Sequence, residues 1–499
     1  MTAGDHSLWT VTQAQFEAAC QAAANEDPES SGTLEIGRKF GIQNVKFLAQ
    51  EPLTIPHQYS ELKILGYGKY NTKIVVDFEP NSNAFSGQGL LTIEAQGVHV
   101  SEIGFDGKHY TDSTKRVPNL VNCGLQGVSP PEGLSFINCL FKNSGNRGIV
   151  GGPISVTKDS SLGSNGSNAG TMLLRDITVE NCHFKDFTDK TAEGKHAIGI
   201  AIYFGNRASW ENSGGVWDTD EVPSSTITKN LISNIVRGVI GDCGNDEWFG
   251  DYSEATDEED VQNVIENQPS KQWGSVAETS FSYTLIEDNT FLSMKRWGIG
   301  FANAKKVTIN KNVISLDITA HTFSHCIHLE AGASAFNITE NTLTNDKTGV
   351  RTDGTLQPLN ACIAILDGTN GDFQNDDGLF NIIIDNNTFD GKCANAIYSE
   401  VGITDTHTLQ HASDDLMDAW PNLGSNLLMT YINRLRQYKI QIVNNDFSQF
   451  NVNWVNNHSG DTASTGWHYR LESNPLGTFD ITTNNNYGTY ANSTFVVNQ

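Results

Sequence analysis

The stretch from Glu287 to Leu316 reads EDNTFLSMKRWGIGFANAKKVTINKNVISL. It holds the same corner twice, because Asn289 and Asn312 each stand two positions before a large apolar residue and each follows a short strand-like run. The two asparagines are 23 residues apart. Between them lies a second apolar run, GIGFA, at Gly298 to Ala302. This stretch therefore contains one complete structural repeat.

The same corner recurs along most of the chain, in segments such as INCLF, ENCHF, TENTL, DNNTF and VNNDF. The corner positions are Cys139, Cys182, Asn230, Asn289, Asn312, Asn341, Asn387, Asn445 and Asn485. Self-similarity at such a period predicts a solenoid. In stacked parallel strands, a buried corner amide donates to the rung above and accepts from the rung below, so identical residues repeat at one turn. The sequence predicts an all-β protein, a right-handed parallel β-helix.

A second strand recurs in each repeat, and three long insertions follow it directly. The strand segments are HAIGIAIYFG (196–205), RGVIGDCG (237–244), GIGFAN (298–303), HCIHLEAG (325–332), ACIAILDG (361–368), NAIYSEVG (395–402) and, more weakly, NVNWVNN (451–457). The insertions cover about 206–222, 244–279 and 403–437. Because all three leave one corner, we expect them to wall one groove, with short helices in the last.

The expected organisation is one elongated domain. Residues 1–90 form an N-terminal cap and the first coils, 91–490 the β-helix with its insertions, and 491–499 a C-terminal tail. The segment Gln13 to Ala24 reads as an amphipathic helix capped by Thr10 or Thr12. Its expected role is to cover the strand edges of the first coil.

The composition limits the classes of partner. The 499 residues carry a formal charge of -26, which disfavours nucleic-acid binding, and no apolar run is long enough to cross a bilayer. We expect a soluble, secreted protein without a membrane partner, whose leader is absent from this chain. The oligomeric state stays open.

Eight cysteines are spread thinly, without a zinc-binding spacing. Cys139 and Cys182 occupy corner positions one repeat apart, so they are either stacked free thiols or a disulfide between rungs. Cys326, Cys362 and Cys393 fall in strands and are expected to point inward.

Acidic residues recur at the outward ends of the second strands. The candidate catalytic acids are Asp242, Glu330, Asp367 and Glu400, with an uncertainty of one residue in register. Carboxyl groups in adjacent rungs would lie about 5 Å apart, and those two rungs apart about 10 Å, which brackets the separations in retaining and inverting glycoside hydrolases. The alternatives are acids that only end strands or that bind a cation.

Histidine supports this site, since His328 stands two residues before Glu330 and is a candidate proton-transfer group. With His321 and His325 it forms a cluster, but zinc binding is disfavoured because the spacing is expected to alternate faces. No cofactor is required. Calcium is possible in DGTNGDFQNDDG (367–378) or TDEED (256–260), which are rich in oxygen ligands.

Cations and aromatic rings gather around the same strands. The cations are Lys195, Arg207, Arg237, Lys295, Arg296 and Lys392, and the rings are Tyr203, Trp210, Trp217, Trp248, Trp273, Trp297 and Tyr398. A row of cations suits repeated sulfate or carboxylate groups on a polysaccharide, with Lys195, Arg237 and Arg296 as candidate ligands. Rings such as Trp297, Tyr203 and Tyr398 either stack on sugars or pack loops on the scaffold.

The corner column, coil length and N-terminal helix resemble those of the pectin-lyase-like superfamily over about four fifths of the chain. The resemblance implies the fold and favours polysaccharide chemistry, but the NTD, DD, GHG and RIK set of polygalacturonases and the DPHD signature of mannuronan epimerases are absent. The leading interpretation is a glycoside hydrolase that cleaves an anionic, carrageenan- or fucan-like polysaccharide. The alternatives are a lyase or epimerase acting on a uronate polymer, and a non-catalytic adhesin or tailspike.

Overall fold

The protein is described here from a computed structural model. The described residues are 8–26, 32–36, 45–80, 89–108, 117–124, 131, 133–151, 177–187, 197–203, 225–242, 281–302, 305–317, 324–330, 334–346, 360–366, 381–401, 438–451, 467–473, 477–481, 484–489 and 494–498.

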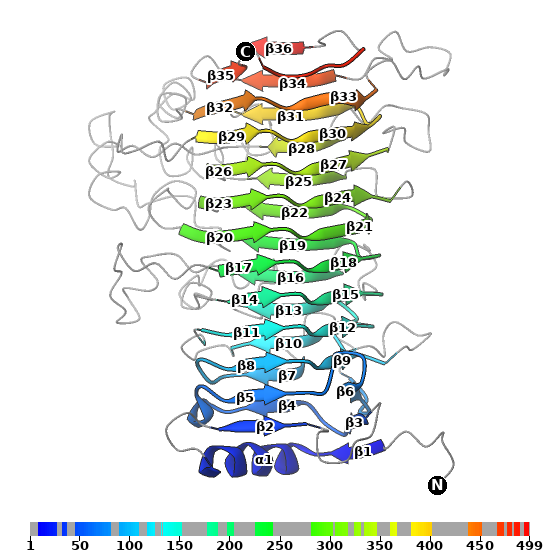
Figure 1. The fold of residues 1–499 in the computed structure, drawn as a ribbon, viewed down its shortest axis with the longest axis vertical. Coiled ribbons are helices and arrows are strands. Elements are labelled where there is room, and N and C mark those ends of the chain that lie inside the picture. The colour runs from blue at the N-terminus through cyan, green and yellow to red at the C-terminus, as the bar shows by residue number, and fades with distance from the viewer. Residues whose placement is uncertain are drawn as a thin grey trace, which may run out of the picture.

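The chain winds through three parallel sheets, each of 12 strands, in the repeating order sheet B, sheet A, sheet C (Figure 1). Sheet A contains β1 (Leu8–Val11), β3 (Val45–Ala49), β6 (Thr72–Val76), β9 (Gly104–Asp106), β12 (Leu140–Lys142), β15 (His183–Lys185), β18 (Leu231–Ser233), β21 (Thr290–Met294), β24 (Val313–Leu316), β27 (Thr342–Asn345), β30 (Thr388–Gly391) and β33 (Asp446–Phe450). Sheet B contains β2 (Thr33–Glu35), β5 (Lys63–Leu65), β8 (His99–Ser101), β11 (Ser135–Ile137), β14 (Thr178–Glu180), β17 (Ser225–Thr228), β20 (Phe281–Glu287), β23 (Lys305–Asn310), β26 (Ser334–Thr339), β29 (Asn381–Asp385), β32 (Tyr438–Val443) and β35 (Gly477–Ile481). Sheet C contains β4 (Leu53–Ile55), β7 (Gly89–Ile93), β10 (Asn119–Cys123), β13 (Arg147–Gly151), β16 (Ile198–Tyr203), β19 (Arg237–Asp242), β22 (Trp297–Ala302), β25 (His325–Glu330), β28 (Ala361–Leu366), β31 (Asn395–Val401), β34 (Trp467–Ser473) and β36 (Thr494–Asn498). The predicted right-handed parallel β-helix is confirmed.

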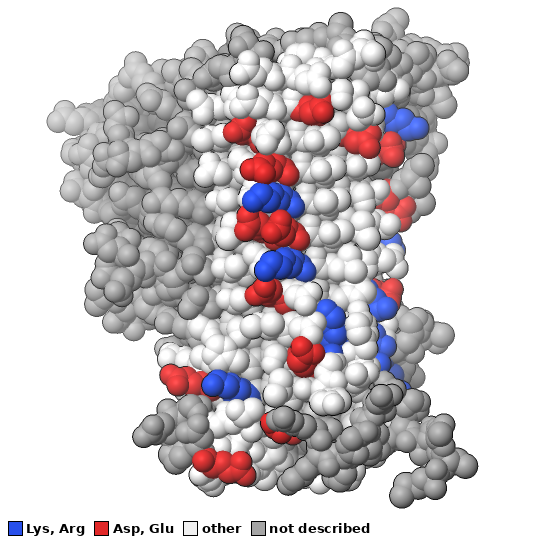
Figure 2. All heavy atoms as spheres, in the orientation of Figure 1, with Lys and Arg blue, Asp and Glu red and all other residues white. Residues whose placement is uncertain are grey.

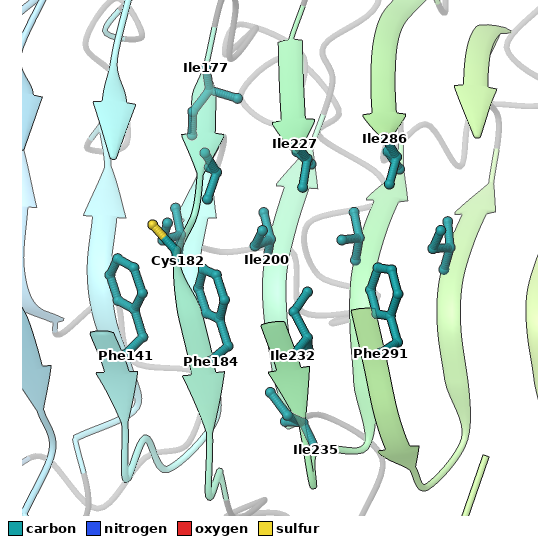
Figure 3. Close-up of a cluster of buried hydrophobic side chains, with 14 of the residues drawn as sticks. Phe141, Ile177, Cys182, Phe184, Ile200, Ile227, Ile232, Ile235, Ile286 and Phe291 are labelled. Atoms are coloured by element: carbon teal, nitrogen blue, oxygen red, sulfur yellow. The ribbon is translucent and has the colours of Figure 1, made fainter. Parts of the chain in front are cut away.

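The core is a column of apolar side chains enclosed by the three sheets (Figure 3). Residues two positions after each corner stack upon one another, as in Phe105, Phe141 and Phe184, whose ring centroids are 5.3 and 4.6 Å apart. This register explains the sequence pattern, because each rung places the same apolar position over the same position of its neighbour.

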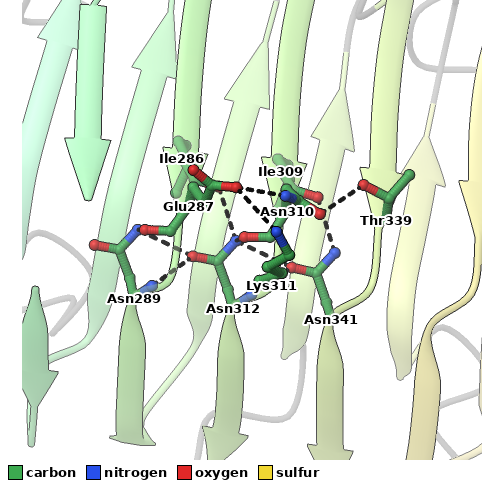
Figure 4. Close-up of polar contacts among 9 residues, drawn as sticks. All are labelled: Ile286, Glu287, Asn289, Ile309, Asn310, Lys311, Asn312, Thr339 and Asn341. Carbon is green, nitrogen blue, oxygen red and sulfur yellow. Dashed lines mark hydrogen bonds and ion pairs between the residues drawn. The ribbon is translucent and has the colours of Figure 1, made fainter. Parts of the chain in front are cut away.

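The corner column forms a hydrogen-bonded ladder (Figure 4). The Asn289 backbone N–H and Nδ2 donate to Asn312 Oδ1 at 3.0 and 2.9 Å, and the same atoms of Asn312 donate to Asn341 Oδ1 at 2.9 and 3.0 Å. Each Nδ2 also donates backward, as from Asn312 to the Ile286 carbonyl at 2.9 Å. The predicted pattern of donation to one rung and acceptance from the other is confirmed.

The residue before each corner from Cys139 to Asn445 adopts a left-handed backbone conformation. These residues are Asn138, Asn181, Lys229, Asp288, Lys311, Glu340, Asn386 and Asn444, with φ between 53° and 55°. The N–H groups of the first seven donate to the next rung, as from Lys229 to the Glu287 carbonyl at 3.1 Å. A left-handed residue with a Cβ costs about 1–2 kcal/mol, which this second ladder offsets at each of those rungs.

Helix α1 (Gln13–Glu26) covers the open end of the first coil and is followed by the short helix η2 (His57–Tyr59) in the next. Thr12 caps α1 reciprocally with Gln15: the Gln15 N–H donates to Thr12 Oγ1 at 3.3 Å, and the Thr12 N–H donates to Gln15 Oε1 at 3.0 Å. The Gln13 carboxamide bonds the backbone of Thr54 twice, which satisfies the free edge of β4 as another strand would. The expected capping role is confirmed.

The seven cysteines in the described part of the chain are free and buried. The Cys139 N–H donates to Cys182 Sγ at 3.3 Å, and the Cys182 N–H donates to Asn230 Oδ1 at 2.8 Å. The two thiols therefore continue the ladder, and the disulfide alternative is wrong. Burial raises the pKa of the Cys182 thiol well above its ordinary value.

One strand prediction is wrong. The segment NVNWVNN (451–457) was expected in sheet C, yet the strand that pairs with β31 there is β34. Asn451 directly follows β33 of sheet A, and residues 452–457 lie outside the described part. The final strand β36 pairs with β34, within the segment expected to be a tail.

The three insertions, including the predicted short helices of 403–437, lie outside the described residues. Each nevertheless begins after a sheet C strand, namely β16, β19 or β31, and leads to the next strand of sheet B. Their shared corner is as predicted. No helix among the described residues is long and apolar enough to cross a membrane.

Candidate active site

The strands of sheet C contain most of the predicted site residues. These strands depart from simple alternation, because two consecutive residues point inward near each strand start. In β25 these are Cys326 and Ile327, both in the central core. His325 and His328, three positions apart, therefore share the outer face, where their rings stack at 5.0 Å. A strict period of two would have separated them.

The first of the two inward positions in β22, occupied by Gly298, requires a small residue. A Cβ added to Gly298 would approach Ile314 Cγ2 to 2.4 Å and the Cys326 carbonyl oxygen to 2.8 Å. A second glycine shapes the outer face, since a Cβ at Gly300 would lie 3.0 Å from Trp297 Cε3. Gly298 thus allows the strand to pack closely against the core, and Gly300 leaves room for the Trp297 indole.

Trp297 is the centre of a stacked cluster, the Arg–Trp–His cluster, formed by Arg237, Arg296, Trp297, His325 and His328. The guanidinium carbons of Arg237 and Arg296 each lie 4.2 Å from the Trp297 ring centroid. The His328 ring stacks on the indole at 3.9 Å with an interplanar angle of 12°. Three of the predicted substrate or catalytic positions, Arg237, Arg296 and His328, thus meet at the fourth, Trp297.

The indole is buried, at 7% exposure, and its Nε1 has no acceptor among the described residues. A ring already stacked on both an imidazole and guanidinium groups holds those groups in place. Of the two roles considered for Trp297, packing on the scaffold fits this environment better than direct stacking on a sugar.

The histidine pair forms one hydrogen bond, with His325 Nδ1 and His328 Nδ1 2.9 Å apart. One ring must donate and the other accept, so the contact requires that at least one Nδ1 carries no proton. Such a pair can hold and pass a single proton. The expectation that His325 and His328 lie on opposite faces is wrong, and His321 lies outside the described residues.

Strand register places three of the four predicted acids in one column. Cα pairing aligns Asp242 with Ala302, Ala302 with Glu330, Glu330 with Leu366, and Leu366 with Glu400. Glu330 stands two positions after His328, and Glu400 two positions after Tyr398, on their strands. Asp367 follows Leu366 and lies outside the described residues, so Leu366 occupies the column in that rung.

One member of this column, Glu472, is not predicted from the sequence, because NVNWVNN (451–457) rather than β34 is expected in its rung. Glu400 pairs with Glu472 of β34, so two acids occupy adjacent rungs. A signal was available in the sequence: IHLE (327–330), IYSE (397–400) and YRLE (469–472) align with the same terminal glutamate.

The remaining predicted residues are less informative. Tyr398 is 1% exposed and packs with Ala361 and Ala364, so it is a packing residue on the same face. Tyr203 pairs with Asp242 through the backbone. Lys295 and Lys392 lie at turns from sheet A to sheet C, as expected. Outside the described residues are Lys195, Arg207, Trp210, Trp217, Trp248, Trp273 and both calcium-binding candidates (256–260 and 367–378). In the described ranges, no three His, Cys, Asp or Glu side chains converge as a metal site.

Comparison with known proteins gives resemblance in fold alone. No family model and no curated protein matches the chain. Among solved structures it is similar to the Streptococcus pneumoniae surface protein and adhesin PfbA, with 10% identity, a TM-score of 0.45 and coverage of 97% of this chain and 96% of that one. It is also similar to the tailspike protein of E. coli bacteriophage HK620, with 10% identity, a TM-score of 0.47 and coverage of 97% and 74%. A third is the GH87 α-1,3-glucanase from Streptomyces thermodiastaticus, with 11% identity, a TM-score of 0.42 and coverage of 99% and 70%. The class defined by fold is the parallel β-helix proteins.

Proposed function

We propose that the protein is a secreted glycoside hydrolase that cleaves an anionic polysaccharide on the outer face of sheet C. The observation that carries the proposal is the acid column, in which Glu330, Glu400 and Glu472 occupy one register position, with Glu330 on the strand that carries His325 and His328. Glycosidic hydrolysis requires two carboxyl groups at a set separation, and stacked rungs impose such separations.

The proposed roles follow from that register. One carboxylic acid protonates the departing glycosidic oxygen, while a second carboxylate removes a proton from the water that attacks the anomeric carbon. Glu330 and Glu400 are two rungs apart, about 10 Å along the helix, which is close to the separation of inverting enzymes. Glu400 and Glu472, in adjacent rungs, would instead suit the shorter separation of retaining enzymes. The anomeric configuration of the first product distinguishes the two pairs.

The Arg–Trp–His cluster supplies the proposed binding chemistry. Arg237 and Arg296 are held against Trp297, and their guanidinium groups suit the sulfate or carboxylate groups of a polysaccharide. The histidine pair lies on the same strand as Glu330, where an imidazole can relay a proton.

The second candidate is a polysaccharide lyase or epimerase acting on a uronate polymer. It is favoured by the same cluster, because imidazole and guanidinium groups can serve in removing the proton next to a carboxylate. A non-catalytic adhesin or tailspike is the third candidate and requires no chemistry at the column.

The reaction type is tested by incubating the full chain with carrageenans, fucans, alginate, pectin and neutral glucans. We expect reducing ends to appear from a sulfated or carboxylated polymer without the ultraviolet absorbance of an unsaturated uronate. The appearance of that absorbance would mean that the reaction is elimination and not hydrolysis. Binding without any change in the polymer would support the adhesin.

A further inference from the structure

A second cationic surface lies on the outer face of sheet A, away from the candidate active site. Figure 2 shows Lys and Arg gathered along the lower right edge of the molecule, where Figure 1 places sheet A. We call Lys46, Lys73, Lys142 and Lys185 the lysine patch. The register places Lys46 beside Lys73, and Lys142 beside Lys185, in adjacent rungs.

Counter-charge within the sheet comes from Asp106, which forms an ion pair with one of the four ammonium groups, that of Lys142. Asp106 stands between the two pairs, opposite Val75 on one side and Lys142 on the other. Asp106 Oδ2 lies 2.8 Å from Lys142 Nζ, and its Oδ1 accepts from Asn143 Nδ2 at 2.7 Å and from the Lys108 N–H at 3.0 Å. Lys185 has a loose contact with Asp186 at 3.9 Å. Among the described residues, Lys46 and Lys73 form no ion pair, so the patch keeps an excess of positive charge.

The electrostatic cost of this arrangement is visible at Lys73. Its pKa is lowered first by burial and then by repulsion from Lys142, with smaller repulsion from Lys46 and Lys185, while Asp106 opposes the shift. Gly104 in the neighbouring rung permits this approach, because a Cβ there would lie 3.0 Å from Lys73 Cγ. Like charges held together without enough counter-charge favour the binding of an anion.

Polar and aromatic groups border the patch. His183 Nδ1 contacts the Tyr70 hydroxyl at 3.1 Å, and its Nε2 contacts Ser233 Oγ at 3.3 Å. Burial and the nearby Lys185 and Lys69 lower the pKa of His183. Tyr70 and Tyr67 are 51% and 55% exposed. Exposed tyrosine rings beside ammonium groups offer both sugar-stacking surfaces and charge pairing.

We propose that the lysine patch is a second binding site, remote from the chemistry, for the sulfate or carboxylate groups of a polysaccharide chain. The lysines span the rungs from β3 to β15, about 19 Å at the usual strand spacing, so the site takes an extended chain. The net charge of -26 of the whole chain would repel such a polymer, which makes a local cationic anchor useful. The site does not depend on the proposed hydrolysis.

The test measures binding of fluorescent dextran sulfate, alginate and neutral dextran of equal length to the full chain. The patch variant is Lys46→Gln/Lys73→Gln/Lys185→Gln, and the control variant is Lys108→Gln/Lys229→Gln/Lys311→Gln. The control removes the same charge from lysines that contact Asp77, Glu180 and Glu287 at 2.8, 2.9 and 3.6 Å. Thermal unfolding verifies that both variants fold.

We expect the patch variant to bind an anionic polymer about tenfold more weakly than wild type, and the control variant to change by less than about twofold. Wild-type binding should disappear between about 0.01 and 1 M salt, where the screening length falls from roughly 30 to 3 Å. Dextran sulfate and alginate distinguish sulfate from carboxylate recognition. Equal losses in both variants, or tighter binding of a DNA oligonucleotide, would overturn the site.

Measurement of hydrolysis distinguishes the lysine-patch proposal from the hydrolase proposal. Turnover of a short oligosaccharide should be unchanged in the patch variant, because the patch lies on sheet A and the acid column on sheet C. If the patch variant loses polymer binding but the wild type shows no hydrolysis, only the hydrolase proposal is contradicted. If the wild type hydrolyses the polymer but the patch variant binds it unchanged, only the lysine-patch proposal is contradicted.

Discussion

At the scale of single residues, the ladder asparagines show how one amide can serve three rungs. Asn312 is fully buried, and its Oδ1 accepts from Asn289 while its Nδ2 donates to Asn341 Oδ1 and to the Ile286 carbonyl. An aliphatic side chain would fill the volume but leave buried donors and acceptors without partners.

Asn312→Leu should therefore lower the free energy of unfolding by about 3 kcal/mol, at roughly 1–3 kcal/mol for each stranded buried group. The matched control is Asn310→Leu on the same turn, where the amide is partly exposed and bonds Glu287 and Thr339. That control should cost less than about 1 kcal/mol. Denaturant unfolding of both variants provides the measurement, and equal costs would mean that burial of the ladder contributes little.

The left-handed column next to the ladder was predictable only in part from sequence. Asn138, Asn181, Asn386 and Asn444 belong to the residue type that adopts positive φ most readily after glycine, but Lys229, Lys311 and Glu340 give no such signal. The corner asparagines were predictable, because a buried amide with a fixed partner in each rung must recur. Tertiary hydrogen bonding, which no local pattern records, selects the conformation beside it.

At the scale of strands, the lysines of β6, β12 and β15 are expected to make the stability of the folded protein depend on pH. Lys73 has a folded-state pKa below the ordinary value of 10.5, so the folded protein releases this proton before the unfolded chain does. Burial, and after it the repulsion from Lys142, oppose folding while Lys73 is charged in both states. Stability therefore rises with pH as the group passes through its folded-state pKa toward 10.5.

Lys73→Gln should consequently raise the melting temperature near neutral pH, and its advantage over wild type should shrink as the pH approaches 10.5. Lys229→Gln provides a control of opposite sign, because the hydrogen bond that Lys229 Nζ donates to Glu180 raises the pKa of Lys229. Its stabilising contribution is present below the ordinary lysine value and is lost as pH rises through the folded-state pKa. Differential scanning fluorimetry across this range measures both, and a Lys73 advantage that grows with pH would contradict the assignment.

Strand periodicity also sets the limits of what the sequence could reveal about the site. Alignment of the strand segments predicted the shared register column of Glu330 and Glu400. The paired inward residues Cys326 and Ile327, however, broke the period of two and brought His325 beside His328. Glu472 was missed because NVNWVNN has strand-like residues and stands nearer to its corner than β34 does. The distance along the chain from corner to strand varies with each connection, so sequence spacing alone could not choose.

At the scale of the whole molecule, the solenoid converts repeats that are distant in sequence into neighbouring carboxyl positions. Glu330, Glu400 and Glu472 are 70 and 72 residues apart in sequence, yet share one column of sheet C. The coils also separate two surfaces on different sheets: the proposed catalytic face on sheet C and the lysine patch on sheet A. A polymer that contacts both would be held while it is cleaved.

The central claim is tested most directly by the turnover number of Glu330→Gln and Glu400→Gln on the best polysaccharide of the panel. Glu287→Gln, a surface acid of sheet B, is the matched control. Each column substitution should leave folding intact and reduce turnover by about 100-fold or more, the usual effect of removing a positioned proton-transfer group. Arg296→Ala should weaken substrate binding mainly at low salt and spare the chemical step. Near-wild-type turnover in both column variants, with turnover abolished in Arg296→Ala, would contradict the account and favour a lyase or epimerase.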